Sequence, residues 1–368
     1  MRRREPAGRN RYRAVMLPSD SSSDSPSPSQ PPADLADRPF DVFAVGNALV
    51  DVQAQVPEDV PASVGFEKGV MTLVDDTAQA KVLDVLNQQF HSDLHRAPGG
   101  SAANTVIGVA GFGGKAAFAG KTGDDELGQL YNDSLRKLGV EPSVAPVPGA
   151  QTGTSVILIT PDADRTMLTN LAASATLAKT NISETAIKQA QWLYVEGYLF
   201  TGESTHQAAL RAIELAREHG TKIAFTMSDP FVVAGFKDEF AKLIAGAADL
   251  VFCNLEEAQA LTGDDDAMAC AAAMHEKCDA VVITLGADGS LIMVDGEAIA
   301  IDGVECEAVD TTGAGDMYAA GILYGITNGL SWEQAGRLAS HASSKIVAKM
   351  GPRLDEPIAA DQIAAIIG

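Results

Sequence analysis

Short apolar strands and amphipathic helices alternate along most of this chain, and this alternation limits the possible folds more than any other feature. The runs expected to form buried strands are Phe40–Val45, Gln191–Val195, Lys222–Thr226, Asp249–Phe252 and Ala280–Leu285. The runs expected to form helices include Ser204–His219, Asp266–Lys277 and Ser331–Lys349. Strands and helices in turn predict an α/β protein with a mostly parallel sheet and helices on both of its faces.

Two segments, residues 52–73 and 152–171, interrupt this alternation of strands and helices. Both contain turn residues and no helical pattern, so each is expected to form a β-hairpin. We expect them to build a small sheet that covers the main domain as a lid and keeps water out of a site. Ordinary hairpins at the edge of the main sheet are the alternative.

The first 38 residues differ in composition from the rest. They carry seven Arg and five acidic residues, followed by a tract rich in Ser and Pro. Such a segment buries too little apolar surface to offset the entropy of ordering, so residues 1–38 are expected to be a disordered, dispensable tail. An organelle-targeting peptide is an alternative for the basic start. Residues 39–368 are expected to form one domain with both lid segments inserted in it.

The net charge of the chain limits the kinds of partner that it can bind. The formal net charge is −22, which disfavours binding to nucleic acids and to anionic lipid surfaces. No apolar run approaches the roughly 20 residues that span a bilayer. The four cysteines show no spacing typical of zinc sites, as expected of a reduced, cytoplasmic protein.

The segment from Asp310 to Asp316 (DTTGAGD) has the strongest chemical signal. It follows a strand-like run at 304–309 and opens a helix-like run at 317–326. Small residues at such a turn leave backbone N–H groups free at the positive end of a helix dipole, which is a site for a phosphoryl group. Asp316 in the first helical turn is expected to be ionised and to accept a proton from a substrate hydroxyl. A plain glycine-rich turn is the alternative.

Two weaker signals lie near the N-terminal end. The glycines Gly99 and Gly100 precede a helix that runs to about residue 112, and Asn104 in that helix offers both a donor and an acceptor. Asp51 follows the first strand and could accept two hydroxyl hydrogen bonds. Together these residues suit the recognition of sugar hydroxyls, although a tightly packed helix N-terminus is an equally ordinary explanation.

The DTTGAGD string and the PGGSAAN string at 98–104 resemble the signature motifs of the ribokinase-like (pfkB) family of carbohydrate and nucleoside kinases. The resemblance extends from Asp41 to Pro352. It implies a three-layer α/β/α sandwich with a mostly parallel central sheet and a small β-sheet lid. It also implies Asp316 as catalytic base, an anion hole made by the amides of Gly313, Ala314 and Gly315, and a sugar site at Asp51, Gly99, Gly100 and Asn104.

The same resemblance assigns a nucleotide side, with ATP and Mg²⁺ as cofactors. Asn254 and Glu257 match an Asn-x-x-Glu element that supports the phosphates and the metal, with Glu257 reaching Mg²⁺ through water. The TLGADG run places ATP contacts at Thr284, Gly286 and Gly289. Some relatives bind K⁺ through the residue that matches Asp310, for which a simple turn carboxylate is the alternative.

Several stretches are more similar to adenosine kinases than to ribokinases. They include the lid segment from Arg165, the run from Met227 to Phe231, and the helix with His341, which in that branch lies beside the ATP adenine. Adenosine kinases carry consecutive Phe residues where this chain has Tyr198-Leu199, so Tyr198 or Phe200 would supply the face that stacks on a base; a place in the buried core is the alternative for both.

The expected function is therefore phosphorylation of a primary hydroxyl of an adenosine-like nucleoside. A sugar kinase for ribose or a ketose and a non-catalytic regulatory relative are the alternatives. The protein is expected to be a monomer or a homodimer.

Overall fold

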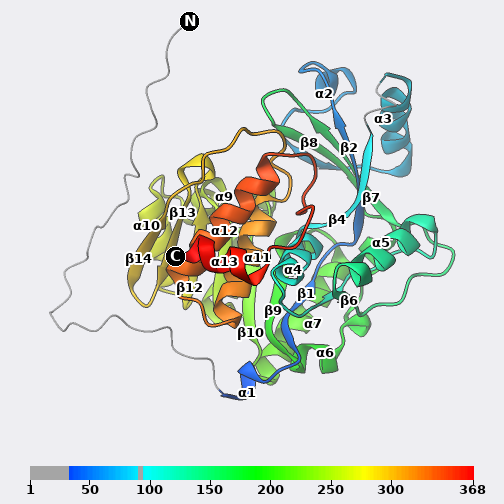
Figure 1. The fold of residues 1–368 in the computed structure, drawn as a ribbon. Helices are drawn as coiled ribbons and strands as arrows, with labels where there is room; N and C mark the ends of the chain where they lie inside the picture. The colour runs from blue at the N-terminus through cyan, green and yellow to red at the C-terminus, as the bar shows by residue number, and fades with distance from the viewer. Residues whose placement is uncertain (1–32, 90–93) are drawn as a thin grey trace, which may run out of the picture.

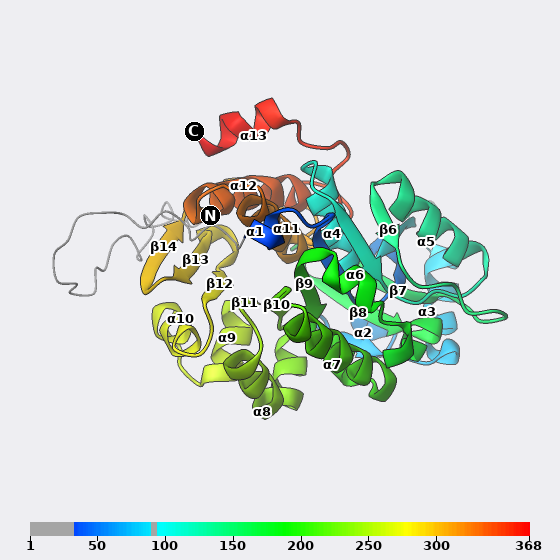
Figure 2. The same ribbon diagram turned by 90° about the horizontal axis from the view of Figure 1, so that it is seen from below.

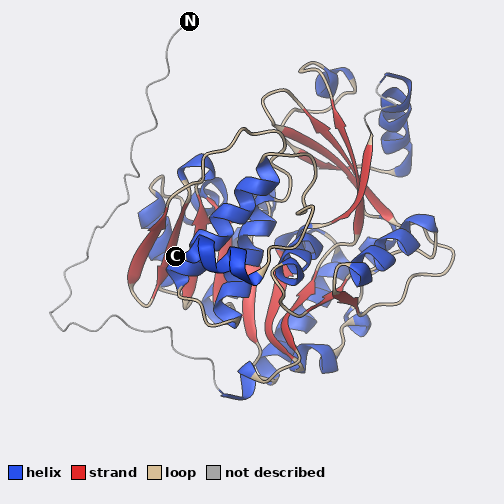
Figure 3. Ribbon diagram, viewed as in Figure 1, coloured by secondary structure: helices blue, strands red, loops and turns tan. Residues whose placement is uncertain are grey.

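In the computed structural model, residues 33–89 and 94–368 are described and form an α/β/α sandwich with a second, smaller sheet beside it (Figures 1 and 3). Within these residues the large sheet has nine strands. In spatial order they are β14 (Glu297–Ile301), β13 (Ser290–Val294), β12 (Ala280–Thr284), β11 (Leu250–Asn254), β10 (Lys222–Thr226), β9 (Ala190–Glu196), β1 (Phe40–Val45), β5 (Ala116–Ala119) and β6 (Val140–Pro142). The strands from β12 to β6 run parallel, and β13 and β14 are antiparallel additions at one edge.

Helices cover both faces of this sheet, as the alternating sequence predicts (Figure 2). One face packs against α4 (Ser101–Gly111), α5 (Glu126–Lys137), α11 (Ala314–Thr327), α12 (Trp332–Val347) and α13 (Ala360–Ile367). The other face packs against α6 (Glu184–Lys188), α7 (Glu203–Glu218), α8 (Pro230–Gly246), α9 (Leu255–Thr262) and α10 (Ala267–His275).

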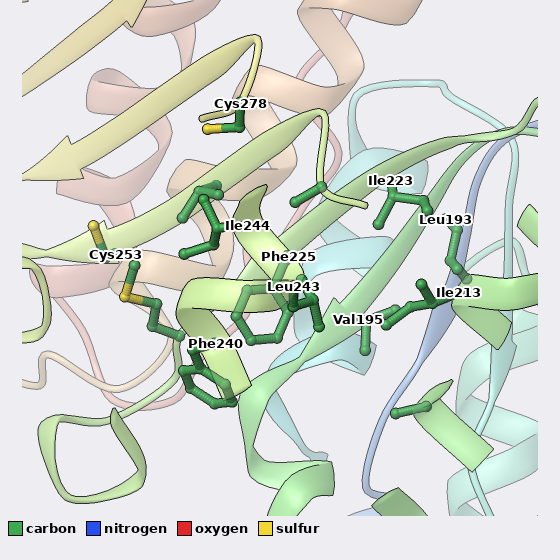
Figure 4. Packing of buried hydrophobic residues seen from close by; sticks show 14 of the residues in the cluster. Leu193, Val195, Ile213, Ile223, Phe225, Phe240, Leu243, Ile244, Cys253 and Cys278 are labelled. Atoms are coloured by element: carbon green, nitrogen blue, oxygen red, sulfur yellow. The ribbon is translucent and has the colours of Figure 1, made fainter. Parts of the chain in front are cut away.

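Strand β1 shows why the chain needs both layers. Val42 and Ala44 are buried in the core on one face, and Phe43 and Val45 are buried in the core on the other. Successive side chains of a strand point to opposite faces, so a strand with four successive apolar residues must be covered on both faces. Figure 4 shows part of the second core, where Phe225 of β10 lies beside Phe240 of α8 with ring centroids 4.8 Å apart.

The smaller sheet has five strands in the described residues, in the order β3 (Met71–Leu73), β8 (Arg165–Asn170), β7 (Gly153–Ile159), β2 (Leu49–Gln55) and β4 (His95–Gly99). Its outer face is covered by the one-turn α2 (Val60–Ser63) and by α3 (Asp76–Gln89), whose Val82 and Leu86 are buried against β2, β7 and β8. The expected small sheet is present.

Its internal pairing differs in part from the expectation. β7 and β8 form the hairpin predicted at 152–171. The prediction of a hairpin without a helix at 52–73 was wrong: β2 pairs with β7 and β4, β3 pairs with β8, and α2 lies between β2 and β3.

Two further boundaries differ from the sequence expectations. The run at 304–309 forms no strand, and residues 302–308 are exposed and irregular. The prediction for 1–38 falls mostly on residues 1–32, which lie outside the described part of the chain. Residues 33–38 pack on the body: α1 (Ala33–Ala36) lies there, Leu35 is buried, and Arg38 donates hydrogen bonds to Ala190 O, Thr221 Oγ1 and His219 O.

Candidate active site

The strand order places a site at the carboxyl ends of β1 and β9. From β1 the chain first moves toward β5 and β6, and later returns to β9 on the opposite side of β1. Such a reversal is a topological switch point, where open α/β sheets commonly bind ligands. Three parts of the described chain meet at this end of the sheet. They are the turn from Asp310 to Asp316, the start of α4 and the small sheet.

The turn before α11 has a backbone that requires glycine. Gly313 precedes the first helical residue with φ of 77°, and a Cβ on it would lie 2.5 Å from Cβ of Pro352. A Cβ on Gly315 would meet no atom within 4 Å, so the space beside this residue is open. Ala314 N–H donates to Thr311 O at 3.3 Å. Apart from this bond, the first turn of α11 has open space beside Gly315 at the positive end of a 14-residue helix without a side-chain cap, which suits an anion.

Asp316 is held at both carboxylate oxygens. Ser101 Oγ donates to its Oδ1 at 2.7 Å, and Asn104 Nδ2 donates to its Oδ2 at 3.0 Å. Burial raises the pKa of Asp316 from its ordinary value, whereas the two hydrogen bonds and the charge of Arg165 lower it. A carboxylate that is fixed in orientation and made more basic by burial is suited to accept a proton.

Asp51 and the glycines of β4 meet across the small sheet. Leu49 of β2 pairs with Gly99, and a Cβ on Gly99 would lie 2.1 Å from Asp51 Oδ2. Gly100 has φ of 93°, and a Cβ there would lie 2.2 Å from the carbonyl oxygen of Asn47. Both glycines are therefore required by close approach. Burial raises the pKa of Asp51 to about 7, with Arg353 lowering it and the carboxylates of Asp316 and Asp310 raising it further. Asp51 and Asp316 are therefore close enough for the charge of Asp316 to change the pKa of Asp51.

The nucleotide-side residues predicted from the sequence fall into neighbouring positions. Asn254 at the end of β11 pairs in register with Thr284 at the end of β12. Gly286 and Gly289 have φ of 60° and 93° in the turn to β13, and a Cβ on Gly289 would lie 2.0 Å from Ile301 O. The geometry of this turn explains both glycines, and contact with ATP stays a prediction.

Asn254 and Glu257 form a reciprocal cap at the start of α9. Glu257 N–H donates to Asn254 Oδ1 at 2.8 Å, while Asn254 N and Nδ2 donate to the Glu257 carboxylate at 3.1 and 2.9 Å. Burial raises the pKa of Glu257 to about 7. Their polar groups are engaged with each other, and no cluster of three or more His, Cys, Asp or Glu suited to a metal occurs in residues 33–89 and 94–368. A role of Glu257 toward Mg²⁺ remains a prediction.

Asp310 organises the turn from within. Its side chain is fully buried and accepts hydrogen bonds from Thr312 N at 2.8 Å, Thr312 Oγ1 at 2.5 Å and Gly351 N at 2.9 Å. These contacts account for the residue as a turn carboxylate, and a part in K⁺ binding stays a prediction.

Of the two candidate aromatic faces, Phe200 belongs to the core. Its ring packs against Phe225, Phe236 and Phe240, and its side chain is buried. Tyr198 is half-buried, and its N–H donates to Ser228 Oγ at 3.3 Å. Tyr198 therefore remains the candidate for contact with a base.

His341 is not brought together with the turn at 310–316. It lines a groove between α12 and α13 with Lys345 and Lys349, and burial followed by the charge of Lys345 lowers its pKa. Ser343 on the same helix reaches the turn instead, since its Oγ donates to Ala314 O at 2.9 Å. Contact of His341 with adenine is left as a prediction.

Ser101 and Arg165 are among the residues near the site that were not predicted as site residues. Ser101 lies inside the PGGSAAN string, and its position at the start of the expected helix is the signal that could have identified it as a site residue. Arg165 lies in β8, and its charge lowers the pKa of Asp316, Asp51 and Asp229. The small sheet also contacts the turn directly, because Thr311 Oγ1 donates to Ala163 O at 3.3 Å. Register between distant segments, which places Arg165 here, could not be derived from the sequence.

A buried carboxylate held by two hydrogen bonds at a helix N-terminus, beside open space and electrostatically coupled to a second buried carboxylate, is an arrangement suited to phosphoryl transfer. The family model described as pfkB family carbohydrate kinase matches residues 71–359. The chain belongs to the pfkB family of carbohydrate kinases. It is therefore an ATP-dependent phosphotransferase that acts on an alcohol group.

Solved structures support the ribokinase-like fold. The adenosine kinase from Sinorhizobium meliloti is 34% identical, with a TM-score of 0.82 over 89% of this chain and 98% of that one. A probable sugar kinase from Rhizobium etli CFN 42 is 32% identical, with a TM-score of 0.85 over 90% of this chain and 100% of that one.

Among curated relatives, the 5-dehydro-2-deoxygluconokinase of Shouchella clausii is 30% identical over 84% of this chain and 90% of its own length. The enzyme of the same name from Bacillus subtilis is 27% identical over 85% of this chain and 91% of its own length. No helix in the described residues is both long and apolar enough to cross a membrane.

Proposed function

We propose that this pfkB kinase transfers the γ-phosphoryl group of ATP to a primary hydroxyl of a nucleoside. The observation that carries the proposal is the pair of hydrogen bonds that fixes the Asp316 carboxylate at the N-terminus of α11. In this reaction Asp316 removes the proton of the acceptor hydroxyl, whose oxygen attacks the γ-phosphorus in line, and ADP leaves from the opposite side. The amides at Gly313, Ala314 and Gly315 stabilise the negative charge on the transferring group.

The first turn of α11 fits a phosphate group. The residue before the helix, Gly313, has no side chain to cap the free N–H groups, and the space beside Gly315 is open. Mg²⁺, which usually keeps several waters and binds phosphate oxygens, would neutralise charge on the phosphates when ATP is bound. Asn254 at the end of β11 and Glu257 in the first turn of α9 are the residues predicted to support Mg²⁺ and the phosphates. They would act through water, because their side chains already cap α9.

The acceptor side fits a molecule with neighbouring hydroxyl groups. Asp51 can accept hydrogen bonds from two hydroxyls, and the absence of a side chain on Gly99 lets that carboxylate lie directly against the backbone of β4. A nucleoside is the leading acceptor for two reasons. The identity to the S. meliloti adenosine kinase exceeds that to the two gluconokinases above, and Tyr198 offers a half-buried ring at the end of β9.

A sugar or sugar acid is the second candidate acceptor. The curated relatives named above are 5-dehydro-2-deoxygluconokinases, and Phe200, one of the two rings expected to stack on a base, is buried in the core. Both acceptors would present a primary hydroxyl to Asp316, so the chemistry at the base is the same for either one.

The deciding experiment incubates the purified protein with Mg·ATP and a panel of acceptors, and records ADP release from each. The panel contains adenosine and other ribonucleosides, ribose, fructose, and 5-dehydro-2-deoxygluconate. The proposal expects the highest kcat/KM with a ribonucleoside. A higher kcat/KM with a sugar or with the sugar acid would reassign the substrate, and ADP release that is no faster with any acceptor than without one would contradict kinase activity.

A further inference from the structure

A buried carboxylate, Glu196, joins the two halves of the site. It is the last residue of β9, its relative exposure is 0%, and no step of the proposed reaction uses it. Its Oε1 accepts hydrogen bonds from Asn47 N at 2.7 Å and from Asn47 Nδ2 at 2.8 Å, and its Oε2 accepts one from Ala102 N at 2.9 Å. Three N–H donors from two separate segments therefore converge on one side chain.

Both segments carry site residues. Asn47 leads directly into β2, where Asp51 lies four residues later. Ala102 is in the first turn of α4, between Ser101 and Asn104, the two residues that hold Asp316. Glu196 thus contacts the strand that presents the acceptor-side carboxylate and the helix that orients the base.

The side chain of Glu196 is tightly packed. A Cβ on Gly46, the residue before Asn47, would lie 2.6 Å from Glu196 Oε2 and 2.5 Å from Ala102 Cβ. Ser174 extends the network, since its Oγ donates to Asn47 Oδ1 at 2.9 Å and accepts from Ala48 N at 3.1 Å. The ends of β1 and β9, which flank the switch point of the sheet, are therefore tied to α4 at one place.

We infer that Glu196 is a positioning residue, which fixes β2 and the start of α4 relative to each other so that the acceptor hydroxyl and Asp316 meet. This inference rests on the proposed function, because it assigns Glu196 a task in that reaction. A buried carboxylate is costly unless hydrogen bonds compensate it, and the three donors on Glu196 do so. The same contacts that stabilise the carboxylate hold the two segments in place.

The test compares Glu196→Gln with Glu196→Asp and with the matched control Glu239→Gln. A Gln side chain keeps the size of Glu but turns an NH₂ group toward Asn47 or Ala102, so a donor faces a donor. Asp keeps the charge but is one methylene too short to reach both segments. Glu239 lies in α8, where its carboxylate contacts His206 and no residue of the site.

The first readout does not require turnover. Hydrogen–deuterium exchange is measured on peptides that cover 46–52 and 99–105, in the absence of ligands. We expect faster exchange in both peptides for the two Glu196 variants, and exchange like the wild type for Glu239→Gln. Unchanged exchange in the Glu196 variants would overturn the inference whether or not the protein is a kinase. Faster exchange throughout the chain would mean a general loss of stability and would also overturn it.

The second readout is kinetic and uses the acceptor that the wild type phosphorylates best. Because a misplacement of about 1 Å can cost on the order of 100-fold in rate, we expect kcat of Glu196→Gln to fall about 10- to 100-fold. The dissociation constant for ATP, measured without acceptor, should stay within about twofold, since every contact of Glu196 described above lies away from Thr284–Gly289. Normal kcat with local changes in exchange would refute the positioning role. An inactive wild type would instead refute the proposed function and leave the exchange result to decide whether Glu196 ties the two segments.

Discussion

Asp316 combines two opposing influences on one carboxylate. Burial makes it more basic, and the hydrogen bonds from Ser101 and Asn104 stabilise its charged form. A base must be deprotonated to act, so the activity is expected to fall as the pH drops through the pKa of Asp316. The two hydrogen-bond donors therefore set the lower pH limit of the reaction.

The variant Ser101→Ala tests this balance. It removes a donor that favours the charged carboxylate, so the pKa of Asp316 should rise. The acidic limb of the kcat–pH profile should move to higher pH, with a smaller change in kcat at the alkaline plateau. Ser143→Ala is the matched control, because the Ser143 hydroxyl donates to Phe118 O and has no contact with Asp316. An acidic limb that stays in place or moves to lower pH would show that Ser101 does not stabilise the anion.

Several residue-level features were readable from the sequence. The DTTGAGD string located the helix start and the base, and the structure adds Ser101 as a donor to that base. The sequence could not separate Tyr198 from Phe200, because both are aromatic and follow the same strand. Packing distinguishes them: Phe200 is buried against three other Phe rings, whereas Tyr198 is only half-buried at the edge of the same core.

At the scale of elements, the start of α9 depends on a buried acid. The folded protein raises the pKa of Glu257 to about 7 from an ordinary value of 4.5. Between about pH 5 and 7 the folded state therefore holds a proton that the unfolded chain has already released. Because stability falls with pH wherever the folded state binds more protons, the free energy of unfolding should decrease from pH 5 to 7.

Glu257→Gln should reduce that dependence. Gln cannot titrate but still offers an acceptor oxygen to the backbone of Asn254, so the slope of unfolding free energy against pH between 5 and 7 should become shallower. Burial also raises the pKa of Asp51 and of Glu196, and both residues contribute to the slope in the wild type and in the variant. The difference between the two slopes therefore reports the contribution of Glu257. Urea unfolding at several pH values provides the measurement, with the variant Glu297→Gln at an exposed position of β14 as control. Equal slopes in wild type and Glu257→Gln would contradict the assigned burial effect.

Elements with a strong local pattern were predicted well, and elements that depend on distant partners were not. The parallel strands and the helices α7, α10 and α12 follow from apolar runs, and the side chains of Asp266 and Ser331 cap α10 and α12, whereas Ser204 lies inside α7 and does not cap it. The alternating residues 304–309 resemble a half-buried strand, yet a strand forms only beside a partner, and this segment is exposed. β3 was misassigned for the related reason that it pairs with β8, where Met71 lies opposite Met167, a residue far along the chain.

At the scale of the whole molecule, helices cover the outer face of the small sheet within the described residues. Its outer side packs against α2 and α3, with Val60, Val82 and Leu86 buried there, and Asp51 on its inner side belongs to the site. A sheet covered in this way does not need a second copy of the chain to shield it. We therefore expect the protein to be a monomer, as light scattering coupled to size-exclusion chromatography at micromolar concentration would show.

A matched experiment ties this expectation to the covering helix. Replacing Leu86 of α3 by Asp should expose the outer face of the sheet and cause association or loss of stability, whereas Gln88→Asp on the exposed side of α3 should leave the monomer intact. A wild-type dimer that buries the small sheet against its copy would contradict this account of the lid.

The central claim is that Asp316 is the base of an ATP-dependent transfer to a hydroxyl group. The most direct test is the single-turnover rate of Asp316→Asn with the best acceptor, alongside its dissociation constant for ATP. Asn keeps the shape of the side chain but takes up no proton, so we expect a fall in rate of about 100-fold or more with ATP affinity within about threefold of the wild type. A rate near that of the wild type would show that another group removes the proton.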